Sequence, residues 1–154
     1  TKVAVVQAKS LHEANLCVQA YKDLGYKKIA FSYGASYYND ICPHPNQDLG
    51  KAIGRFMVIS TMFRDKTIAN TDRIHLLGTA SPIEFGMYKN MPFIESIDTS
   101  NPIMAAIGEM PYTKMGLHLK PMANMNKHQD ISKEFVNEDL VDFNVEMFRT
   151  INGL

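Results

Sequence analysis

Polar residues and glycines end four short apolar segments of the chain, and these are the positions best placed for chemistry. The segments end in Gln7, in Ser32-Tyr33-Gly34, in Leu77-Gly78 and in Asp98. A carboxylate such as that of Asp98 can act as a nucleophile, as a base or as a helix cap. The Gln7 amide offers both a donor and an acceptor, which suits the edge of a planar base. Glycine lets a ligand approach the backbone closely.

Each of these residues also has a purely structural interpretation, and the sequence leaves both open. Asp98 precedes a helix-prone run and could cap that helix. Gln7 could be a buried amide whose hydrogen bonds are satisfied within the protein. Gly34 and Gly78 could serve only as turn residues. His75 lies inside an apolar segment, which favours a packed histidine over a catalytic one.

The four apolar segments are short and nearly continuous, as in strands that are buried on both faces of a parallel sheet. We predict strands over residues 3–7, 28–33, 74–78 and 93–98. Helical spacing of apolar residues predicts helices over 11–24, 48–64, 83–89 and 103–108, with a loop over 36–46. Ser10 and Glu13 have the spacing of a capping box, Gly25 ends the first helix, and Ser81-Pro82 starts the third. Alternating strands and helices predict an α/β protein, whose strand C-termini bring the polar residues to one edge.

The last third of the chain differs in character. Residues 110–130 are rich in Met, Asn, Lys and His without a clear period, which predicts an extended loop. An amphipathic run over 132–151 predicts a closing helix, with apolar positions at Phe135, Val136, Leu140, Phe143, Val145, Met147, Phe148 and Ile151. Four βα units in 154 residues fit half of a (β/α)8 barrel, since a whole one needs about 250 residues.

We therefore expect one domain over residues 1–154, built as the C-terminal half of a (β/α)8 barrel with parallel strands and a closing C-terminal helix. The chain begins at Thr1 and enters a strand almost at once, which leads us to expect a fragment or a processed chain. A half-barrel leaves two open sheet edges that another chain must cover, so we expect the chain not to be monomeric.

Charge and composition argue against several classes of protein. The formal net charge is zero, which argues against a dedicated, strongly basic nucleic-acid module. Lys114, Lys120 and Lys127 could still form a local phosphate-binding site or simply a solvated loop. No apolar run reaches membrane-spanning length, and no signal peptide is visible. The two cysteines, Cys17 and Cys42, make no disulfide framework, so we expect a cytoplasmic location.

The order of the four segments resembles that of the tRNA-guanine transglycosylase superfamily, which includes relatives that insert deazaguanines into DNA. Val5-Val6-Gln7-Ala8 is similar to the family's strand ending in V-Q-G. Residues 24–34 resemble its L-G-F-x-G-Y-A-I-G-G segment, and residues 73–82 resemble R-Y-L-M-G-V-G-T-P. Residues 93–102 resemble V-D-M-F-D-C-V-x-P-T-R. The similarity covers roughly residues 3–107, in the same order and at similar spacing.

The resemblance implies a pentosyltransferase that exchanges a guanine-type base in tRNA or DNA for a 7-deazaguanine. It implies that Asp98 is the nucleophile that forms a covalent glycosyl intermediate, and that Gln7 binds the base edge. The base pocket would be lined by Ser32, Tyr33, Gly34, Leu77 and Gly78. The implied partners are the nucleic acid, a purine or deazapurine base, and another protein chain or a second copy that completes the barrel. No membrane partner is expected.

The sequence departs from the family pattern in several places. Ser32-Tyr33 stands at a glycine pair, Ala8 at a glycine, and Pro102-Ile103-Met104 at P-T-R. The zinc ligands C-x-C-x-x-C…H are absent, and Cys42-x-His44 lacks further ligands, so we expect no metal and no other cofactor. The N-terminal half of the barrel is not in this chain, so whether the chain is an active enzyme stays open.

Two alternatives follow from these departures. The chain could be a non-catalytic half-barrel that serves as a binding or structural subunit descended from the same family. It could instead belong to an unrelated α/β-barrel enzyme that binds a phosphate-bearing substrate at Thr79-Ala80-Ser81, before a helix.

Overall fold

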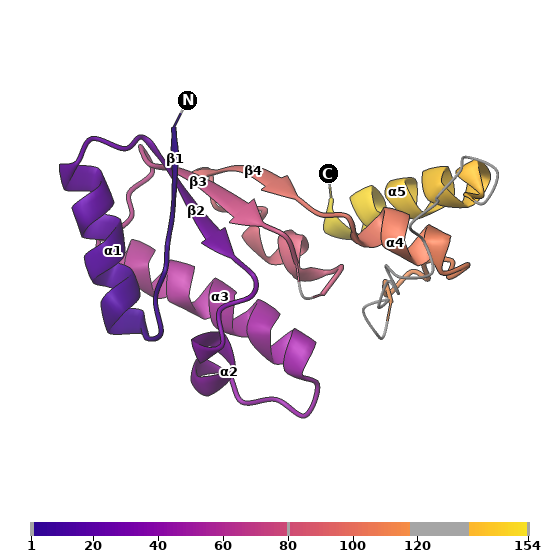
Figure 1. Ribbon diagram of the computed structural model, residues 1–154, viewed down its shortest axis with the longest axis horizontal. Helices are drawn as coiled ribbons and strands as arrows, with labels where there is room; N and C mark the ends of the chain where they lie inside the picture. The colour runs from indigo at the N-terminus through magenta and orange to yellow at the C-terminus, as the bar shows by residue number, and fades with distance from the viewer. Residues whose placement is uncertain (1, 80, 118–135, 154) are drawn as a thin grey trace.

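The centre of the molecule is a four-stranded parallel sheet with strand order β1-β2-β3-β4 (Figure 1). The computed structural model describes residues 2–79, 81–117 and 136–153. The strands are β1 (Val3–Val5), β2 (Lys28–Ser32), β3 (Arg73–Leu77) and β4 (Ile94–Asp98). Each strand pairs in parallel with the next one along the chain. The predicted α/β class and the four predicted strands are therefore confirmed, with bounds shifted by one or two residues.

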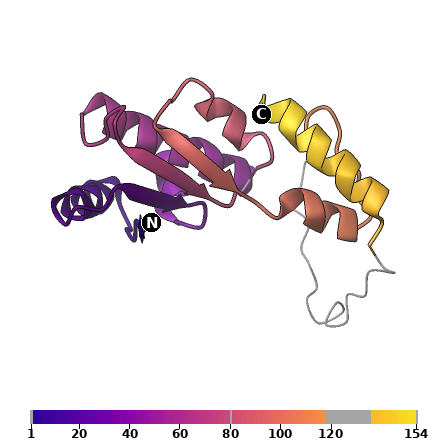
Figure 2. The same cartoon turned by 90° about the horizontal axis from the view of Figure 1, so that it is seen from above.

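Helices connect the strands, as parallel neighbours require. They are α1 (Leu11–Asp23), α2 (Tyr37–Ile41), α3 (Gln47–Arg64), the 3₁₀ helix η1 (Glu84–Tyr88), α4 (Asn101–Ile107) and α5 (Glu138–Asn152). In Figure 1 the sheet lies above α2 and α3, and in the view from above in Figure 2 the strands lie in front of α3. Figure 2 also shows α4 and α5 side by side beyond the C-terminal end of β4. In the described part of the chain, helices thus cover one face of the sheet.

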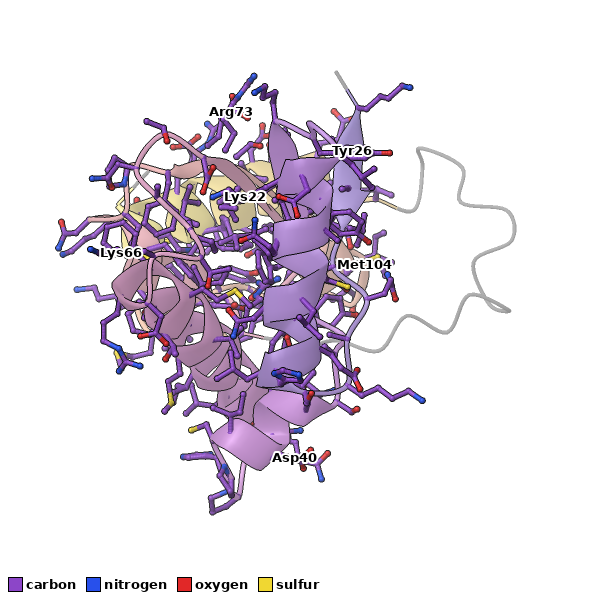
Figure 3. The ribbon with its side chains drawn as sticks, turned by 90° about the vertical axis from the view of Figure 1, so that its left-hand side faces the viewer. Lys22, Tyr26, Asp40, Lys66, Arg73 and Met104 are labelled. Atoms are coloured by element: carbon purple, nitrogen blue, oxygen red, sulfur yellow. The ribbon has the colours of Figure 1, made fainter. Side chains whose placement is uncertain are left out.

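The two faces of the sheet differ in side-chain chemistry. Ile29, Phe31, Ile74 and Leu76 point to the helices and are at most 2% exposed. Since side chains alternate along a strand, Lys28, Arg73 and His75 belong to the opposite, uncovered face. Glu95 forms ion pairs there with Lys28 and Arg73, and their hydrogen bonds, that of Arg73 first, lower the pKa of its carboxyl group. In Figure 3, Arg73 of β3 lies at the top of the molecule and Asp40 of α2 lies at the bottom.

The first helix begins and ends as predicted. The Glu13 amide donates to Ser10 Oγ over 3.2 Å, and Glu13 Oε2 accepts the Lys9 amide over 2.8 Å. This is a capping box in which the glutamate reaches one residue further back than usual. Gly25 follows the helix with φ +79°, a left-handed conformation that favours glycine.

The predicted loop over 36–46 contains a helix, α2, so that prediction was wrong. Tyr37 and Tyr38 of α2 are only 3% and 1% exposed. Gly50 and Gly54, one turn apart on α3, allow this close approach, because a Cβ on Gly54 would lie 2.2 Å from the Tyr38 carbonyl oxygen. A tertiary contact therefore stabilises α2, and local periodicity does not reveal it.

The later helices also differ from the prediction in detail. The helix expected over 83–89 is the five-residue 3₁₀ helix η1, whose N-cap is Ile83. Ser81 is not a side-chain cap, and its main-chain oxygen accepts the Glu84 amide. Residues 110–117 are irregular as expected, with one bridge between Thr113 and Gly116. Residues 118–130 of the predicted loop lie outside the described residues.

The closing helix α5 is present, and of its predicted apolar positions Phe148 is buried and Met147 and Ile151 pack against the core. Its described part begins after the N-cap Asn137, and residues 132–135 lie outside the described residues. Phe143, an expected apolar contact, is 47% exposed, whereas Asn144 and Asn152 are 0% and 2% exposed. Phe148 is buried between them. None of the helices in the described residues is long and apolar enough to cross a membrane.

Candidate functional site

The C-terminal ends of β3 and β4 bring together the predicted nucleophile and a glycine. Register pairs Leu77 with Asp98, and the Gly78 amide donates to Asp98 Oδ1 over 2.8 Å. Gly78 has φ +63°, which favours glycine over other residues. The Asp98 carboxylate remains 59% exposed. The hydrogen bond fixes one carboxylate oxygen and leaves the group accessible to a ligand.

The structure does not assign Asp98 to the cap of the following helix. The N-cap of α4 is Ser100, without a side-chain cap hydrogen bond. The Asn101 amide donates to Thr99 Oγ1 over 3.1 Å instead. Asp98 therefore bonds to the neighbouring strand end.

His75 lies beside Asp98 on the uncovered face of the sheet. His75 Nε2 is 3.7 Å from Asp98 Oδ1, and His75 Nδ1 is 2.8 Å from Ser96 Oγ. The imidazole is only 18% exposed, so the expected packed histidine also has two polar neighbours. Side chains alternate along β3, and Ile74 and Leu76 face the helices. The sequence could therefore have placed His75 on the uncovered face.

Two of the five predicted pocket residues, Tyr33 and Gly78, line a small cavity at the strand ends. A cavity of about 90 Å³ is lined by Tyr33, Gly78, Thr79, Thr99, Ser100, Asn101 and Met104. Small-molecule sites usually measure about 300–1,000 Å³. The Tyr33 ring packs on Gly78, where a Cβ would lie 2.6 Å from Tyr33 Cδ1. As it stands, this cavity is too small for a purine.

The other predicted pocket residues form the ends of β2 and β3. The Ser32 hydroxyl accepts the Gly34 amide over 3.3 Å, which is a local turn contact. The Leu77 carbonyl oxygen accepts the Tyr33 amide over 3.0 Å. Ser32, Tyr33, Gly34, Leu77 and Gly78 thus lie at two adjacent strand ends, as expected.

Gln7 lies away from these residues. It follows β1, is exposed, and its carbonyl oxygen accepts the Cys17 thiol over 3.3 Å. Two strands separate β1 from β4, so Gln7 and Asp98 are on opposite edges of the sheet, about 14 Å apart at ordinary strand spacing. Within the chain, the structure does not bring the predicted base-reading amide next to the predicted nucleophile.

The predicted basic residues fall partly outside the described structure. Lys114 is exposed in the turn between Thr113 and Gly116. Lys120 and Lys127 lie outside the described residues. Ala80 of the alternative anion site at Thr79-Ala80-Ser81 lies outside the described residues, and the Thr79 hydroxyl donates to the Glu84 carboxylate over 2.7 Å. A phosphate bound at Thr79 would lie close to this carboxylate, which would repel it.

Behind the strand ends lies a buried ion pair that was not predicted from the sequence. Arg55 of α3 and Glu84 of η1 are both 0% exposed, and Arg55 Nε lies 2.6 Å from Glu84 Oε1. Arg55 Nη1 donates to the carbonyl oxygens of Phe31 (2.9 Å) and Leu77 (3.1 Å). Arg55 Nη2 donates to the Gly78 carbonyl oxygen over 2.8 Å. Arg55 therefore ties together the C-terminal ends of β2 and β3.

Burial and pairing act against each other in this cluster. Burial, the largest single effect, disfavours the charge of Arg55, but Glu84 together with the neighbouring Tyr88 and Tyr38 outweighs it and raises the pKa of the guanidinium group. Desolvation by burial is the main cause that raises the pKa of the neighbouring Tyr88, and the charge of Glu84 is the next. The sequence held a signal for Arg55, since helical spacing puts it on the same stripe as the apolar Ala52, Ile59 and Met62.

Within the described residues, no group of three or more His, Cys, Asp or Glu side chains converges as a metal site would require. His44 Nδ1, from the Cys42-x-His44 pair, lies 3.0 Å from the Asn46 amide nitrogen.

Comparison with known proteins finds no match to a protein family, to a curated protein or to a solved structure. The site is thus defined by its geometry, as an exposed carboxylate at a strand C-terminus of a parallel α/β sheet.

Proposed function

We propose that the chain is the C-terminal half of a (β/α)8 barrel and supplies the nucleophile of a transglycosylase. In this proposal the enzyme exchanges a guanine-type base in tRNA or DNA for a 7-deazaguanine. The observation that carries it is the Asp98 carboxylate, exposed at the end of β4 and oriented by the Gly78 amide. In parallel α/β sheets, reactive residues lie at this edge.

The proposed reaction is a double displacement at the anomeric carbon of the nucleotide. One Asp98 oxygen forms a bond to that carbon while the bond to the guanine nitrogen breaks, and guanine leaves with the electron pair and takes up a proton. The incoming deazaguanine, after losing a proton, attacks the same carbon and releases the carboxylate. Because Oδ1 accepts the Gly78 amide, Oδ2 is the oxygen that attacks.

The proposal also requires a partner that completes the barrel. The uncovered sheet face would become the barrel interior, and the edges at β1 and β4 would pair with further strands. A cavity of about 340 Å³ beside β4, lined in part by Met91, Ile94 and Ile97, could receive side chains of such a strand. In a half-circle the two edges face each other across the interior, so Gln7 and Asp98 would flank a base bound between them.

The test is exchange of isotopically labelled guanine or deazaguanine into tRNA and into DNA. It uses the chain together with the segment or partner that completes the barrel. Asp98→Asn should abolish both exchange and a denaturation-resistant adduct between protein and nucleic acid, because the amide is a poor nucleophile. Asp65→Asn, which changes an exposed carboxylate at the end of α3, is the matched control. Equal exchange by wild type and Asp98→Asn would contradict the proposal.

One observation favours a second candidate, a non-catalytic half-barrel subunit. Tyr33 covers Gly78 and leaves only about 90 Å³ of cavity. Such a subunit would form a stable complex with another chain and would bind no base. Calorimetric titration of the complex with guanine and with a deazaguanine distinguishes the two, because only the enzyme should bind a base.

A further inference from the structure

We propose that Arg55 is a positioning residue for Asp98 and acts through the Leu77–Gly78 peptide group. The catalytic consequence rests on the proposed function, whereas the positioning itself does not. Asp98 is more than 40 residues away from Arg55 along the chain, and a single peptide group links the two side chains.

The link consists of two hydrogen bonds on one planar group. The Leu77 carbonyl oxygen accepts Arg55 Nη1 over 3.1 Å. The amide of the same peptide group, that of Gly78, donates to Asp98 Oδ1 over 2.8 Å. Because the peptide is planar and trans, the direction of its carbonyl sets the direction of its amide. Holding the oxygen therefore aims the hydrogen at Asp98.

A second contact prevents rotation of the next peptide group. Arg55 Nη2 donates to the Gly78 carbonyl oxygen over 2.8 Å. Gly78 has φ +63° and no side chain to restrict it, so its backbone needs an external constraint. The guanidinium group is a rigid fork, and two of its nitrogens hold two successive carbonyls. Lysine keeps the charge but lacks the planar fork, so its ammonium group does not hold the two carbonyls in this fixed geometry.

Glu84 in turn fixes the guanidinium group. Glu84 Oε1 lies 2.6 Å from Arg55 Nε, and Glu84 Oε2 accepts the Thr79 hydroxyl over 2.7 Å. Both charged side chains are 0% exposed, so water does not replace these contacts. The chain of contacts thus runs from Glu84 through Arg55 and the peptide group to the carboxylate of Asp98.

The experiment follows the Gly78 amide signal in proton–nitrogen NMR spectra of folded variants. Arg55→Met combined with Glu84→Met removes both charges at once and leaves no unpaired buried charge. Arg55→Lys keeps the charge without the fork, and serves if the double variant fails to fold. Asp98→Asn gives the reference for a weakened acceptor. Lys22→Met is the control, because it breaks a separate 2.8 Å ion pair, between Lys22 and Asp72. Figure 3 labels Lys22, on α1.

We expect the Gly78 amide proton to move upfield in both Arg55 variants, in the direction seen for Asp98→Asn, while Lys22→Met leaves it in place. Hydrogen exchange of that amide should become about tenfold faster. A folded Arg55 variant with the wild-type Gly78 signal would overturn the inference.

The activity assay is read separately from the spectra. If base exchange occurs, its single-turnover rate should fall about 10- to 100-fold in Arg55→Lys, with KM unchanged, as for other residues that orient a reacting group. A wild type without base exchange would refute the proposed function but not the positioning, which the Gly78 signal alone decides. An unchanged rate in Arg55→Lys despite a shifted signal would overturn the catalytic part.

Discussion

At the scale of single residues, the most consequential pair is Arg55 and Glu84. Both side chains are fully buried and their charged atoms are 2.6 Å apart. A buried ion pair gains little net stability, because desolvation of both charges offsets their attraction. Removing one partner, however, leaves the other charge buried and unpaired. The pair is therefore far more sensitive to one substitution than to two.

We predict that Glu84→Gln lowers the free energy of unfolding by about 3–5 kcal/mol, because Arg55 then remains charged in the interior. The double variant Arg55→Met, Glu84→Met should lose clearly less unfolding free energy than Glu84→Gln. Urea unfolding followed by circular dichroism measures both. Arg64→Ala, which breaks an exposed pair with Asp65, should unfold like wild type. A double variant that is less stable than Glu84→Gln would contradict this account.

Buried tyrosines predict a loss of stability at alkaline pH. Desolvation raises the pKa of Tyr38 and of Tyr88 above the unfolded value of about 10. Below that pH both states keep the proton, and the stability is fully present. As pH rises through 10, the unfolded chain releases protons that the folded one retains, so the free energy of unfolding falls.

We expect this fall to be measurable by urea unfolding at a series of pH values from neutral to alkaline. Tyr38→Phe combined with Tyr88→Phe should reduce the pH dependence, because it removes these two ionising groups and keeps the rings. Tyr26→Phe, in which the residue lies outside this cluster, is the matched control. The same slope in wild type and in the double variant would rule out these two residues as the cause.

The residues of the site divide into those that the sequence predicts and those it does not. Asp98 and Gly78 were predicted because they end apolar strands, and the end of an apolar run can be located from the sequence alone. Arg55 was missed because its partners are carbonyl groups of two strands and a carboxylate 29 residues away. Such contacts depend on how the elements pack, which periodicity does not specify.

At the scale of elements, two asparagines anchor the closing helix α5. Asn144 accepts the Tyr112 amide over 2.8 Å and donates to the Met110 carbonyl oxygen over 3.0 Å. Asn152 accepts the Gly86 amide over 2.8 Å and donates to the Pro82 carbonyl oxygen over 2.7 Å. The sequence pattern predicts the helix but places its contacts on apolar residues. Asparagine is mostly exposed in proteins, unless its amide satisfies buried backbone groups as it does here.

We predict that Asn144→Ala lowers the free energy of unfolding by about 2–3 kcal/mol, since it leaves the buried Tyr112 amide without its acceptor. Phe143→Ser is the control on the same helix. Phe143 is 47% exposed, so its replacement should change stability by no more than about 0.5 kcal/mol. Urea unfolding of both variants measures these losses. A larger loss of unfolding free energy in Phe143→Ser than in Asn144→Ala would mean that the apolar residue Phe143, and not Asn144, anchors the helix.

At the scale of the whole molecule, the strand order leaves two edges unpaired within the described residues. β1 and β4 each pair with one neighbour, and Val3 of β1 is 42% exposed. The Val6 amide donates to the Ala30 carbonyl oxygen, so by alternation the Val5 amide points away from β2. The Tyr21 hydroxyl donates to the Val5 carbonyl oxygen over 3.0 Å and covers part of this edge. An exposed edge with apolar side chains is a surface for pairing with further strands.

We therefore predict that the isolated chain is not monomeric, and that sedimentation velocity will show a species heavier than one chain. Val3→Lys should shift the distribution toward monomer, because a charged side chain on an edge strand disfavours strand pairing. Leu16→Lys places the same charge on an exposed apolar site, 58% exposed on α1, and should leave the distribution unchanged. Equal shifts in the two variants would point to general solubility instead of the β1 edge. A wild-type monomer that unfolds cooperatively would contradict the prediction and would mean that the described sheet is stable with both edges open.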